Sequence, residues 1–351
     1  MKTVLVTGGA GFIGSNFIRL ALEVRPDWRV VVLDALTYAG NLENLEGLEA
    51  AYPGRYRFAH ADVTDAGRVR ALFEEEAIAA VVHFAAETHV DRSILGPTAF
   101  VKTNVMGTAT LLEAARGAWK DRPGRYLQVS TDEVYGSLKE TGFFTEQTPL
   151  DPSSPYSASK AAADQLALSY HRTFGMDVVV TRCCNNYGPY QFPEKLIPLM
   201  ITRALAGENL PVYGTGQNVR DWIHVDDHNR GVLLVLDKGR AGEVYNLGAR
   251  CEKRNLDLVK ELLRVAAEVK GWDPVQAEGK ITFVTDRPGH DWRYAIDPSK
   301  AEAELGYASQ VPFRQGLENT VRWYLEHEGW WRRVQSGAYK DFVRALYGER
   351  R

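Results

Sequence analysis

The chain has 351 residues, of which 45% are hydrophobic and 25% are charged, and its formal net charge is −3 with histidine neutral. This length favours about two domains with sizeable cores, and the evenly spread, near-neutral charge argues against binding to nucleic acid or to a membrane surface. No apolar run approaches the roughly 18 residues that a membrane-spanning helix needs, and no signal peptide is apparent, so we expect a cytoplasmic protein.

The first half of the sequence alternates short apolar runs with amphipathic stretches. The apolar runs are rich in β-branched residues and predict buried strands, whereas the stretches between them have helical spacing. Buried strands that alternate with helices predict an α/β fold with a doubly wound parallel (Rossmann) sheet. The expected strands are 2–7, 29–34, 55–60, 80–84, 126–130 and 176–182, and the expected first helix is 14–24.

After Pro189 the pattern changes to short loops, rich in Pro, Gly and Tyr, that alternate with helices. We therefore expect a Rossmann domain over 1–189, to which the chain returns at about 222–248. A second, smaller mixed α/β domain over 190–351 would bind the substrate. The Trp- and Arg-rich stretch 321–333 predicts an amphipathic helix that caps the fold.

The three cysteines are Cys183, Cys184 and Cys251. Two are adjacent and none has a partner at zinc-ligand spacing, so they predict neither a disulfide framework nor a zinc site. We expect buried thiols in a reducing compartment. The histidines at positions 89, 224 and 290 share no ligand spacing either, so we expect no metal.

A glycine-rich turn, 7–14 (TGGAGFIG), follows the first strand and precedes the first helix. It fits G-x-G-x-x-G from Gly9 or G-x-x-G-x-x-G through Gly8, Gly11 and Gly14. Glycines at this place allow backbone N–H groups and the helix N-terminus to approach a pyrophosphate. Asp34 ends the second strand, twenty residues after Gly14. A carboxylate there accepts hydrogen bonds from ribose hydroxyls and repels a 2′-phosphate, which favours NAD over NADP.

Two further strand ends suit the same cofactor. Asp62 and Val63 follow the third strand and would lie at the adenine edge. Phe84, Ala85 and Ala86 end the fourth strand, where small side chains permit close approach of the cofactor, although simple packing explains alanines equally well.

Tyr156 and Lys160 lie one turn apart on a predicted helix, for which Ser154 is a plausible N-cap and Pro155 a suitable first residue. A phenol has a pKa of about 10, so it is a poor base unless a cation stabilises the phenolate. Lys160 would supply that cation and would also hold the nicotinamide ribose.

Asp132 and Glu133 are adjacent carboxylates directly after the fifth strand, where ligands bind in open α/β sheets. An Asp-Glu pair in a loop most often faces water or caps the next element. At this strand end the two groups are expected to have separated pKa values, so that one acts as a general acid and the other as a general base.

With these motifs the chain resembles the extended short-chain dehydrogenase/reductases. More narrowly, it is similar to their dTDP-glucose 4,6-dehydratase branch, and the Thr-Asp-Glu triplet is the most specific shared element. Two departures are Thr88, where serine is frequent, and Trp292, where a basic residue is frequent. The matching stretches are 85–93, 130–136, 156–160, 185–198 and 286–297.

The resemblance implies conversion of dTDP-glucose to dTDP-4-keto-6-deoxyglucose and water, with NAD as a tightly held cofactor. Tyr156 would take the C4 hydroxyl proton while C4 gives hydride to NAD, and Thr131 would hydrogen-bond the C4 oxygen. Glu133 would then remove the C5 proton and Asp132 would protonate the departing C6 hydroxyl, before hydride returns to C6.

The resemblance also implies the binding residues and a homodimer that pairs through two long helices near 98–116 and 156–174. Lys195 and Arg220 would meet the diphosphate. Cofactor contacts are implied at Gly8, Gly11, Phe12, Ile13, Gly14, Asp34, Ala35, Leu36, Thr37, Asp62, Val63, Phe84, Ala85, Ala86, Thr88, Thr103, Tyr156, Lys160 and Asn186. Substrate contacts are implied at Thr88, Thr131, Asn185, Lys195, Leu196, Pro211, Val212, Tyr213, Arg220, Asn255, Asp286, Arg287 and His290.

Two alternatives remain open at this stage. One is a nucleotide-sugar epimerase or decarboxylase on the same scaffold, which would have no leaving group for Asp132 to protonate. The other is an NAD-binding regulator that has lost catalysis. Against it stands the intact set of candidate catalytic residues, which are Thr131, Asp132, Glu133, Tyr156 and Lys160. Thymine and uracil differ by one methyl group, so these residues are compatible with either nucleobase.

Overall fold

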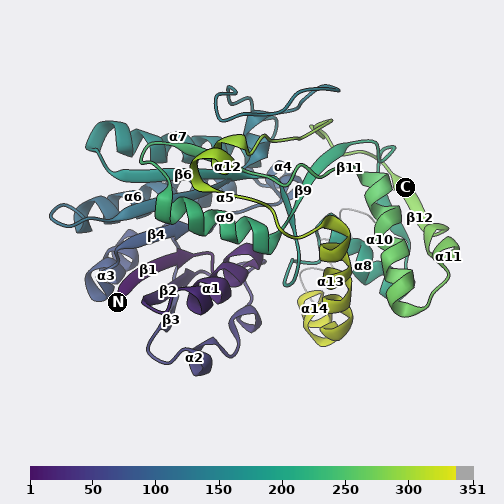
Figure 1. Cartoon of the computed structure of the whole chain (residues 1–351), viewed down its shortest axis with the longest axis horizontal. Helices are drawn as coiled ribbons and strands as arrows, with labels where there is room; N and C mark the ends of the chain where they lie inside the picture. Colours follow the sequence, from purple (N-terminus) through teal and green to yellow (C-terminus); the bar gives the residue numbers. More distant parts are fainter. Residues whose placement is uncertain (337–351) are drawn as a thin grey trace.

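Seven parallel strands form the central sheet of the protein, whose computed structural model describes residues 1–336. The strands are hydrogen-bonded in the order β10-β6-β5-β4-β1-β2-β3, and every neighbouring pair is parallel. Helices cover both faces of this sheet, so the expected doubly wound fold is confirmed (Figure 1). The strands are β1 (Lys2–Thr7), β2 (Trp28–Asp34), β3 (Tyr56–His60), β4 (Ala80–His83), β5 (Arg125–Thr131), β6 (Asp177–Cys183) and β10 (Val244–Leu247).

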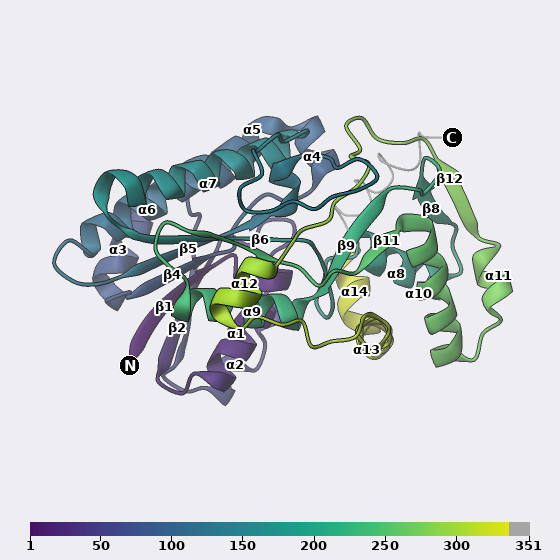
Figure 2. The same ribbon diagram turned by 45° about the horizontal axis from the view of Figure 1, so that its top comes forward.

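Side chains that alternate along each strand supply two separate cores, one on each face of the sheet. Val4 and Val6 of β1 pack in one core, and Leu5 packs in the other. Figure 2 shows the resulting three layers. One helical layer contains α3 (Ala66–Glu76), α4 (Val90–Leu95), α5 (Pro97–Phe100), η2 (Val101–Met106), α6 (Gly107–Ala118) and α7 (Pro155–Phe174). The other contains α1 (Phe12–Val24), η1 (Leu42–Leu45), α2 (Leu48–Ala51), α9 (Val225–Lys238) and α12 (Ser299–Leu305).

The six expected strands begin and end within one residue of the observed ones, and α1 begins two residues earlier than expected. The helix expected over 98–116 is instead α5 and α6 joined by the π-helical turn η2. Asn104 of this turn accepts a hydrogen bond from Glu87 N (2.8 Å) and donates to Glu87 O (3.0 Å) and to Ser159 Oγ (2.8 Å). These contacts hold the wider turn between the loop that follows β4 and α7.

The second part of the molecule lies beyond the carboxyl ends of the strands (Figure 2). Its core contains Met200, Leu258, Leu262, Leu317 and Tyr324. A three-stranded sheet contains β7 (Asn185–Tyr187), β9 (Val219–His224) and β11 (Glu252–Arg254), and a two-stranded sheet contains β8 (Leu210–Tyr213) and β12 (Ile281–Val284). The helices are α8 (Leu196–Ala206), α10 (Asn255–Lys270), α11 (Pro274–Glu278), α13 (Phe313–Glu326) and α14 (Glu328–Val334).

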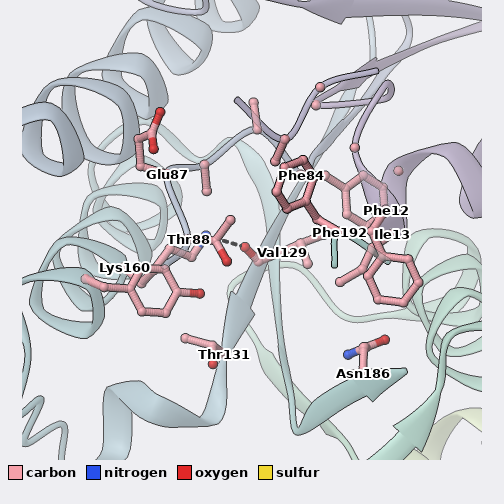
Figure 3. A pocket seen from close by; sticks show the side chains of 18 of the residues that line it. Phe12, Ile13, Phe84, Glu87, Thr88, Val129, Thr131, Lys160, Asn186 and Phe192 are labelled. Atoms are coloured by element: carbon pink, nitrogen blue, oxygen red, sulfur yellow. Dashed lines mark hydrogen bonds between the residues drawn. The ribbon is translucent and has the colours of Figure 1, made fainter. Parts of the chain in front are cut away.

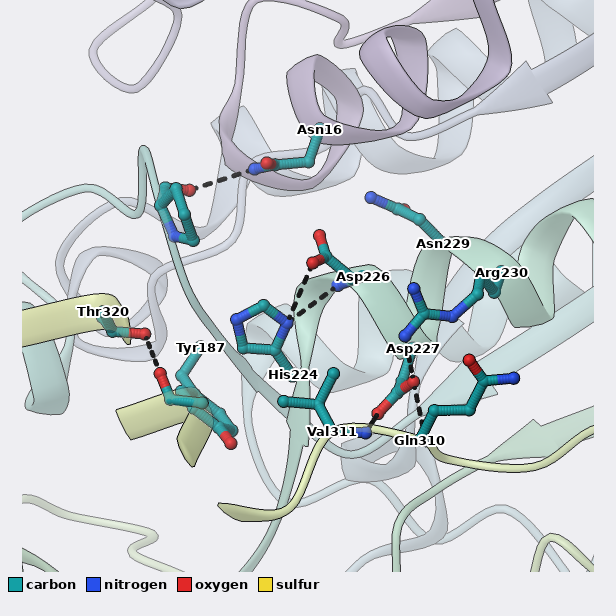
Figure 4. A network of polar contacts seen from close by, with 12 residues as sticks. Asn16, Tyr187, His224, Asp226, Asp227, Asn229, Arg230, Gln310, Val311 and Thr320 are labelled. Carbon is teal, nitrogen blue, oxygen red and sulfur yellow. Dashed lines mark hydrogen bonds and ion pairs between the residues drawn. The ribbon is translucent and has the colours of Figure 1, made fainter. Parts of the chain in front are cut away.

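Polar contacts near the start of α9 join the two parts (Figure 4). The Asp227 carboxylate accepts hydrogen bonds from Gln310 N and Val311 N, both at 2.9 Å, and so anchors the segment that leads into α13. Asn16 of α1 donates to Pro189 O at 3.0 Å, at the point where the chain leaves the first part. After Pro189 and before Gln310 the chain returns to the first part, where α9 packs on α1 and β10 pairs with β6.

The Trp-rich stretch expected as one helix forms two, because the chain leaves the helical conformation at His327 (φ −112°, ψ 36°). This break allows Trp330 and Trp331 to be buried together. Trp330 Nε1 donates to Asn44 Oδ1 of η1 at 2.9 Å, so the stretch does cap the first part of the fold. Residues 337–351 of the expected second domain lie outside the described residues. Among the described helices, none is both long and apolar enough to cross a membrane.

Candidate active site

A cavity lies at the carboxyl ends of the central strands, beside the point between β1 and β4 where the strand order reverses. Ligands bind at this place in open α/β sheets. Figure 3 shows side chains from both parts of the molecule that line it. The predicted residues that line the cavity are Gly8, Gly11, Phe12, Ile13, Gly14, Asp34, Ala35, Thr37, Asp62, Val63, Phe84, Ala85, Ala86, Thr88, Thr103, Thr131, Asp132, Glu133, Tyr156, Lys160, Asn185, Asn186, Lys195 and Leu196.

The glycine-rich turn has no room for side chains at two of its positions. Gly8 has φ +68°, and a Cβ there would lie 2.6 Å from Ala85 N. A Cβ at Gly14 would lie 2.4 Å from Gly8 O. Gly11 caps α1, so the helix N-terminus and its N–H groups face the cavity. This cradle fits a pyrophosphate, whose charge the helix dipole stabilises.

Asp34 connects the glycine-rich turn to the loop that follows β2. Its carboxylate accepts hydrogen bonds from Ala10 N (2.9 Å) and Leu36 N (2.8 Å), which fix the glycine turn relative to the following loop. Burial raises the pKa of Asp34, and these two N–H groups oppose the rise. The Leu36 side chain packs against the core on the α1 face and does not line the cavity, in contrast to its predicted neighbours Ala35 and Thr37.

The Thr-Asp-Glu triplet forms the end of β5 and the single turn η3 (Asp132–Tyr135). Thr131 Oγ1 caps this turn by accepting from Glu133 N at 3.3 Å and donates to Asp132 Oδ1 at 3.3 Å. Asp132 is 1% exposed, and its Oδ2 has no hydrogen-bond partner among residues 1–336. Burial raises the pKa of Asp132 well above its ordinary value, and the charges of Glu133 and Asp221 add to this effect. The site therefore favours the protonated form of Asp132.

Glu133 has a different electrostatic environment. Burial raises its pKa as well, but the cations of Arg287, Lys195 and Arg220 oppose the rise. The two neighbouring carboxyl groups thus have different environments, which favour the protonated form more strongly at Asp132 than at Glu133.

The helix α7 supplies the phenol and the amine. Ser154 and Ser157 form a capping box at its start and Pro155 is its first residue, which confirms the predicted N-terminus. Lys160 Nζ donates to Val129 O at 2.6 Å (Figure 3). Burial raises the pKa of Tyr156 well above its ordinary value, and Glu133 adds to this effect. The structure therefore places the phenol and the amine in one cavity but does not show the lowering of the phenol pKa that their spacing predicted.

Two predicted cations, Lys160 and Lys195, line the cavity, and a third, Arg220, lies on β9 outside its lining. Lys195 Nζ donates to Thr88 O at 3.0 Å, and the Arg220 guanidinium donates to Val219 O (2.7 Å) and Asp291 O (2.9 Å). Among residues 1–336, neither these two side chains nor Lys160 forms an ion pair with a carboxylate. Their charge is therefore available to an anionic ligand.

The other predicted substrate residues form a second group beside β8. Tyr213 Oη donates to Asp91 Oδ2 at 3.3 Å, and the Arg287 guanidinium lies 3.9 Å from the same oxygen. His290 lies 2.6 Å from Asp286, and burial lowers its pKa to about 4. Further residues do not reach the cavity described above: Pro211 and Val212 are buried in β8, Arg220 lies on β9, and Asn255 begins α10.

Several cavity residues were not among the predicted site residues, although some of them lie within the stretches that match the family. Tyr38 directly follows the predicted contact Thr37, and Glu194 directly precedes the predicted Lys195 within the matching stretch 185–198, so these positions were the available signal. Cys183 and Cys184 are buried free thiols, as expected, and also line the cavity, whereas Cys251 is half-buried. The other missed lining residues are Leu33, Ala39, Gly40, Glu87, Val129, Ser130, Gln191, Phe192 and Trp222.

Comparison with known proteins places this site in a family. The model of the family described as GDP-mannose 4,6 dehydratase matches residues 5–320. A dTDP-glucose 4,6-dehydratase from Xanthomonas campestris pv. campestris (strain B100) is 53% identical over 347 residues, which are 97% of this chain and 98% of that protein.

Solved structures agree with this assignment. The dTDP-glucose 4,6-dehydratase DesIV from Streptomyces venezuelae, determined with NAD bound, has a TM-score of 0.88 and 53% identity, and the match covers 95% of this chain and 99% of that one. The dTDP-glucose 4,6-dehydratase of Bacillus anthracis str. Ames in complex with NAD has a TM-score of 0.85 and 46% identity over 95% and 100% of the two chains. The chain therefore belongs to the GDP-mannose 4,6 dehydratase family and, within it, to the dTDP-glucose 4,6-dehydratases.

Proposed function

We propose that the protein converts dTDP-glucose to dTDP-4-keto-6-deoxyglucose and water, with NAD as its resident cofactor. The observation that carries this proposal is the presence of Asp132, Glu133, Tyr156 and Lys160 in one cavity with the glycine cradle. An enzyme that only oxidises C4 has no use for the carboxyl pair. Relatives at about half identity that act on dTDP-glucose favour this nucleotide sugar over GDP-mannose.

The cradle, Asp34 and Lys160 would hold NAD, which accepts a hydride from C4 of the sugar and returns it to C6. Tyr156 Oη takes the proton of the C4 hydroxyl, and Thr131 Oγ1 hydrogen-bonds the same oxygen. The burial that raises the phenol pKa must be overcome by positive charge in the loaded site. Lys160 contributes such a charge, because a carbonyl and not a carboxylate holds its ammonium.

The carboxyl pair performs the elimination. Oxidation at C4 acidifies the C5 hydrogen, which Glu133 removes as a carboxylate. Asp132 donates its proton to the departing C6 oxygen, and water leaves. Hydride then returns to C6, and Glu133 gives its proton back to C5. The pKa of Asp132 is raised well above its ordinary value by burial, which suits this acid role, and the cations around Glu133 suit the base role.

Incubation of the protein with dTDP-glucose, followed by the absorbance of the 4-keto-6-deoxy product in alkali, tests this function. UDP-glucose and GDP-mannose in parallel reactions test the nucleobase. We expect product from dTDP-glucose at a rate at least tenfold above either alternative. A dTDP sugar recovered without loss of water would contradict the proposal and would favour an epimerase.

We also propose that the protein is a cytoplasmic homodimer. The three free cysteines suit a reducing compartment. Large apolar side chains are exposed along the layer that contains α7: Leu95 (73%), Met106 (57%), Val101 (51%) and Phe174 (50%). A self-complementary pairing of two copies would cover this surface.

Light scattering tests the dimer. The double variant Leu95→Asp with Met106→Asp should be a monomer, whereas Val275→Asp, at an apolar site on α11 that is 75% exposed, should remain a dimer. A monomeric native protein would contradict this proposal and would leave the reaction assignment intact.

A further inference from the structure

Three segments that are distant in sequence meet at the edge of the cavity. Tyr38 belongs to the loop after β2, Arg92 to α4, and Glu194 to the loop before α8. Tyr38 and Glu194 both line the cavity. The meeting point therefore connects the cofactor side, through the Asp34 loop, with the substrate side, through the residue next to Lys195.

Tyr38 contacts each of the other segments through a different face. Its hydroxyl donates to Glu194 Oε1 at 3.2 Å. The Arg92 guanidinium lies 3.7 Å from the centre of its ring, a cation–π contact, and the Phe192 ring packs edge-on at 5.6 Å. Arg92 and Phe192 thus contact the Tyr38 ring, while the Glu194 carboxylate accepts a hydrogen bond from its hydroxyl.

Glu194 is poorly suited to a merely structural role. It is 7% exposed, and its Oε2 is buried without a hydrogen-bond partner among residues 1–336. A buried carboxyl oxygen that lacks a partner costs free energy of folding, so stability alone does not explain it. Charged groups surround it. The charges of Lys195 and Arg92 lower the pKa of Glu194 and that of Asp91 raises it, while the charge of Glu87 raises the pKa of Tyr38.

We propose that Tyr38, Arg92 and Glu194 form a clasp, which holds the Asp34 loop closed on bound NAD and limits the rate at which NAD leaves. The three are positioning residues, because they act through the Asp34 loop. This inference rests on the proposed function, since it requires that the cavity binds NAD. A chain that binds no NAD would refute that function, whereas a chain that binds NAD but releases it independently of these residues would refute only the clasp.

The dissociation rate of NAD tests the clasp directly. The protein is loaded with radiolabelled NAD, excess unlabelled NAD is added, and the bound label is followed by filter binding. Tyr38→Phe keeps the ring and removes the hydroxyl, so we expect release about tenfold faster than in the native protein, as for loss of a hydrogen bond to a charged group. Tyr245→Phe is the matched control. Tyr245 lies on β10, does not line the cavity, and donates from its Oη to the Glu304 carboxylate at 2.9 Å.

Glu194 variants distinguish positioning from loss of structure. Glu194→Gln retains an acceptor for Tyr38 and should release NAD more slowly than Glu194→Ala, even where both have the same melting temperature. Burial raises the pKa of Glu194 to about 7, while Lys195 and Arg92 oppose the rise. Release from the native protein should therefore accelerate as the pH falls from 8 to 6, and release from Glu194→Gln should not.

Two results would overturn the proposal. One is release from Tyr38→Phe at the rate of the native protein or of Tyr245→Phe. The other is a Glu194→Ala variant that is folded, by its melting temperature, and retains NAD as long as the native protein does.

Discussion

Lys160 Nζ donates a hydrogen bond to Val129 O at 2.6 Å, which joins the catalytic helix α7 to strand β5 of the triplet. Lys160 is 4% exposed, and burial lowers the pKa of its amine while Asp164 opposes the shift. The carbonyl holds the ammonium of Lys160 in place without neutralising its positive charge.

Lys160→Met should reduce turnover by about 100-fold, because the general base Tyr156 then loses a stabilising cation. The profile of kcat against pH should also move its acid limb to higher pH. Lys300→Met is the control, since Lys300 Nζ donates to Val244 O at 2.7 Å and pairs with Glu243, and neither partner lines the cavity. Equal effects of the two substitutions would contradict a specific role for the Lys160 charge.

Replacement of the two carboxyl groups should separate the steps of the reaction. Glu133→Gln lacks the C5 base, so we expect turnover to fall by roughly 100-fold while dTDP-glucose still produces NADH absorbance. Asp132→Asn lacks the acid and should accumulate the same absorbance, yet it should retain exchange of the C5 hydrogen with deuterated water. Exchange in Glu133→Gln at the native rate would show that another group is the base.

The buried ion pair between Arg182 and Asp164 joins β6 to α7. Its charged atoms are 2.9 Å apart, and the two side chains are 3% and 0% exposed. Asp164→Ala leaves the guanidinium buried without its partner, so the free energy of unfolding in urea should fall by about 3–5 kcal/mol. Asp164→Leu combined with Arg182→Met should be less destabilised than Asp164→Ala, because no charge is then buried. The opposite order would show that the pair itself is strongly stabilising.

His228 of α9 should make the protein sensitive to acid. It is fully buried, both ring nitrogens lack partners among residues 1–336, and burial lowers its pKa to about 3. The unfolded chain binds a proton near pH 6.5 and the folded chain does not, so the stability contributed above that pH is lost as the pH falls.

At pH 5 this loss is about 2 kcal/mol. His228→Leu should therefore gain about that much stability relative to the native protein between pH 7 and pH 5, as measured by urea unfolding at each pH. Replacement of the exposed His60 by Leu is the control. Parallel pH profiles for native protein and His228→Leu would contradict the assignment.

The predictions from sequence were accurate where the backbone has a strict local requirement. The turn at Gly8 and the N-cap at Ser154 depend on residues close together in the chain, and both formed as expected. The break at His327 and the π-helical turn at Asn104 were missed, because each is set by a distant partner, Asn44 for Trp330 and Glu87 for Asn104.

The candidate site shows the same division. Residues within motifs, such as Asp132 and Tyr156, line the cavity together. Tyr38 and Glu194 were not predicted as site residues, because they meet only after folding, across 156 residues of sequence. The direction of the Tyr156 pKa was also beyond the sequence, since burial depends on the whole site.

The return of the chain to β10 has a consequence for the order in which the protein is made. The central sheet receives its last strand only after β7, β8 and β9 of the other part have been synthesised. A ribosome-bound chain that ends before residue 244 therefore exposes β6 as an open edge, which invites pairing with other chains. The first part is therefore incomplete until most of the second part has been synthesised. A fragment that ends at residue 189 lacks β10, so we expect it to aggregate and not to behave as a separate cofactor-binding domain.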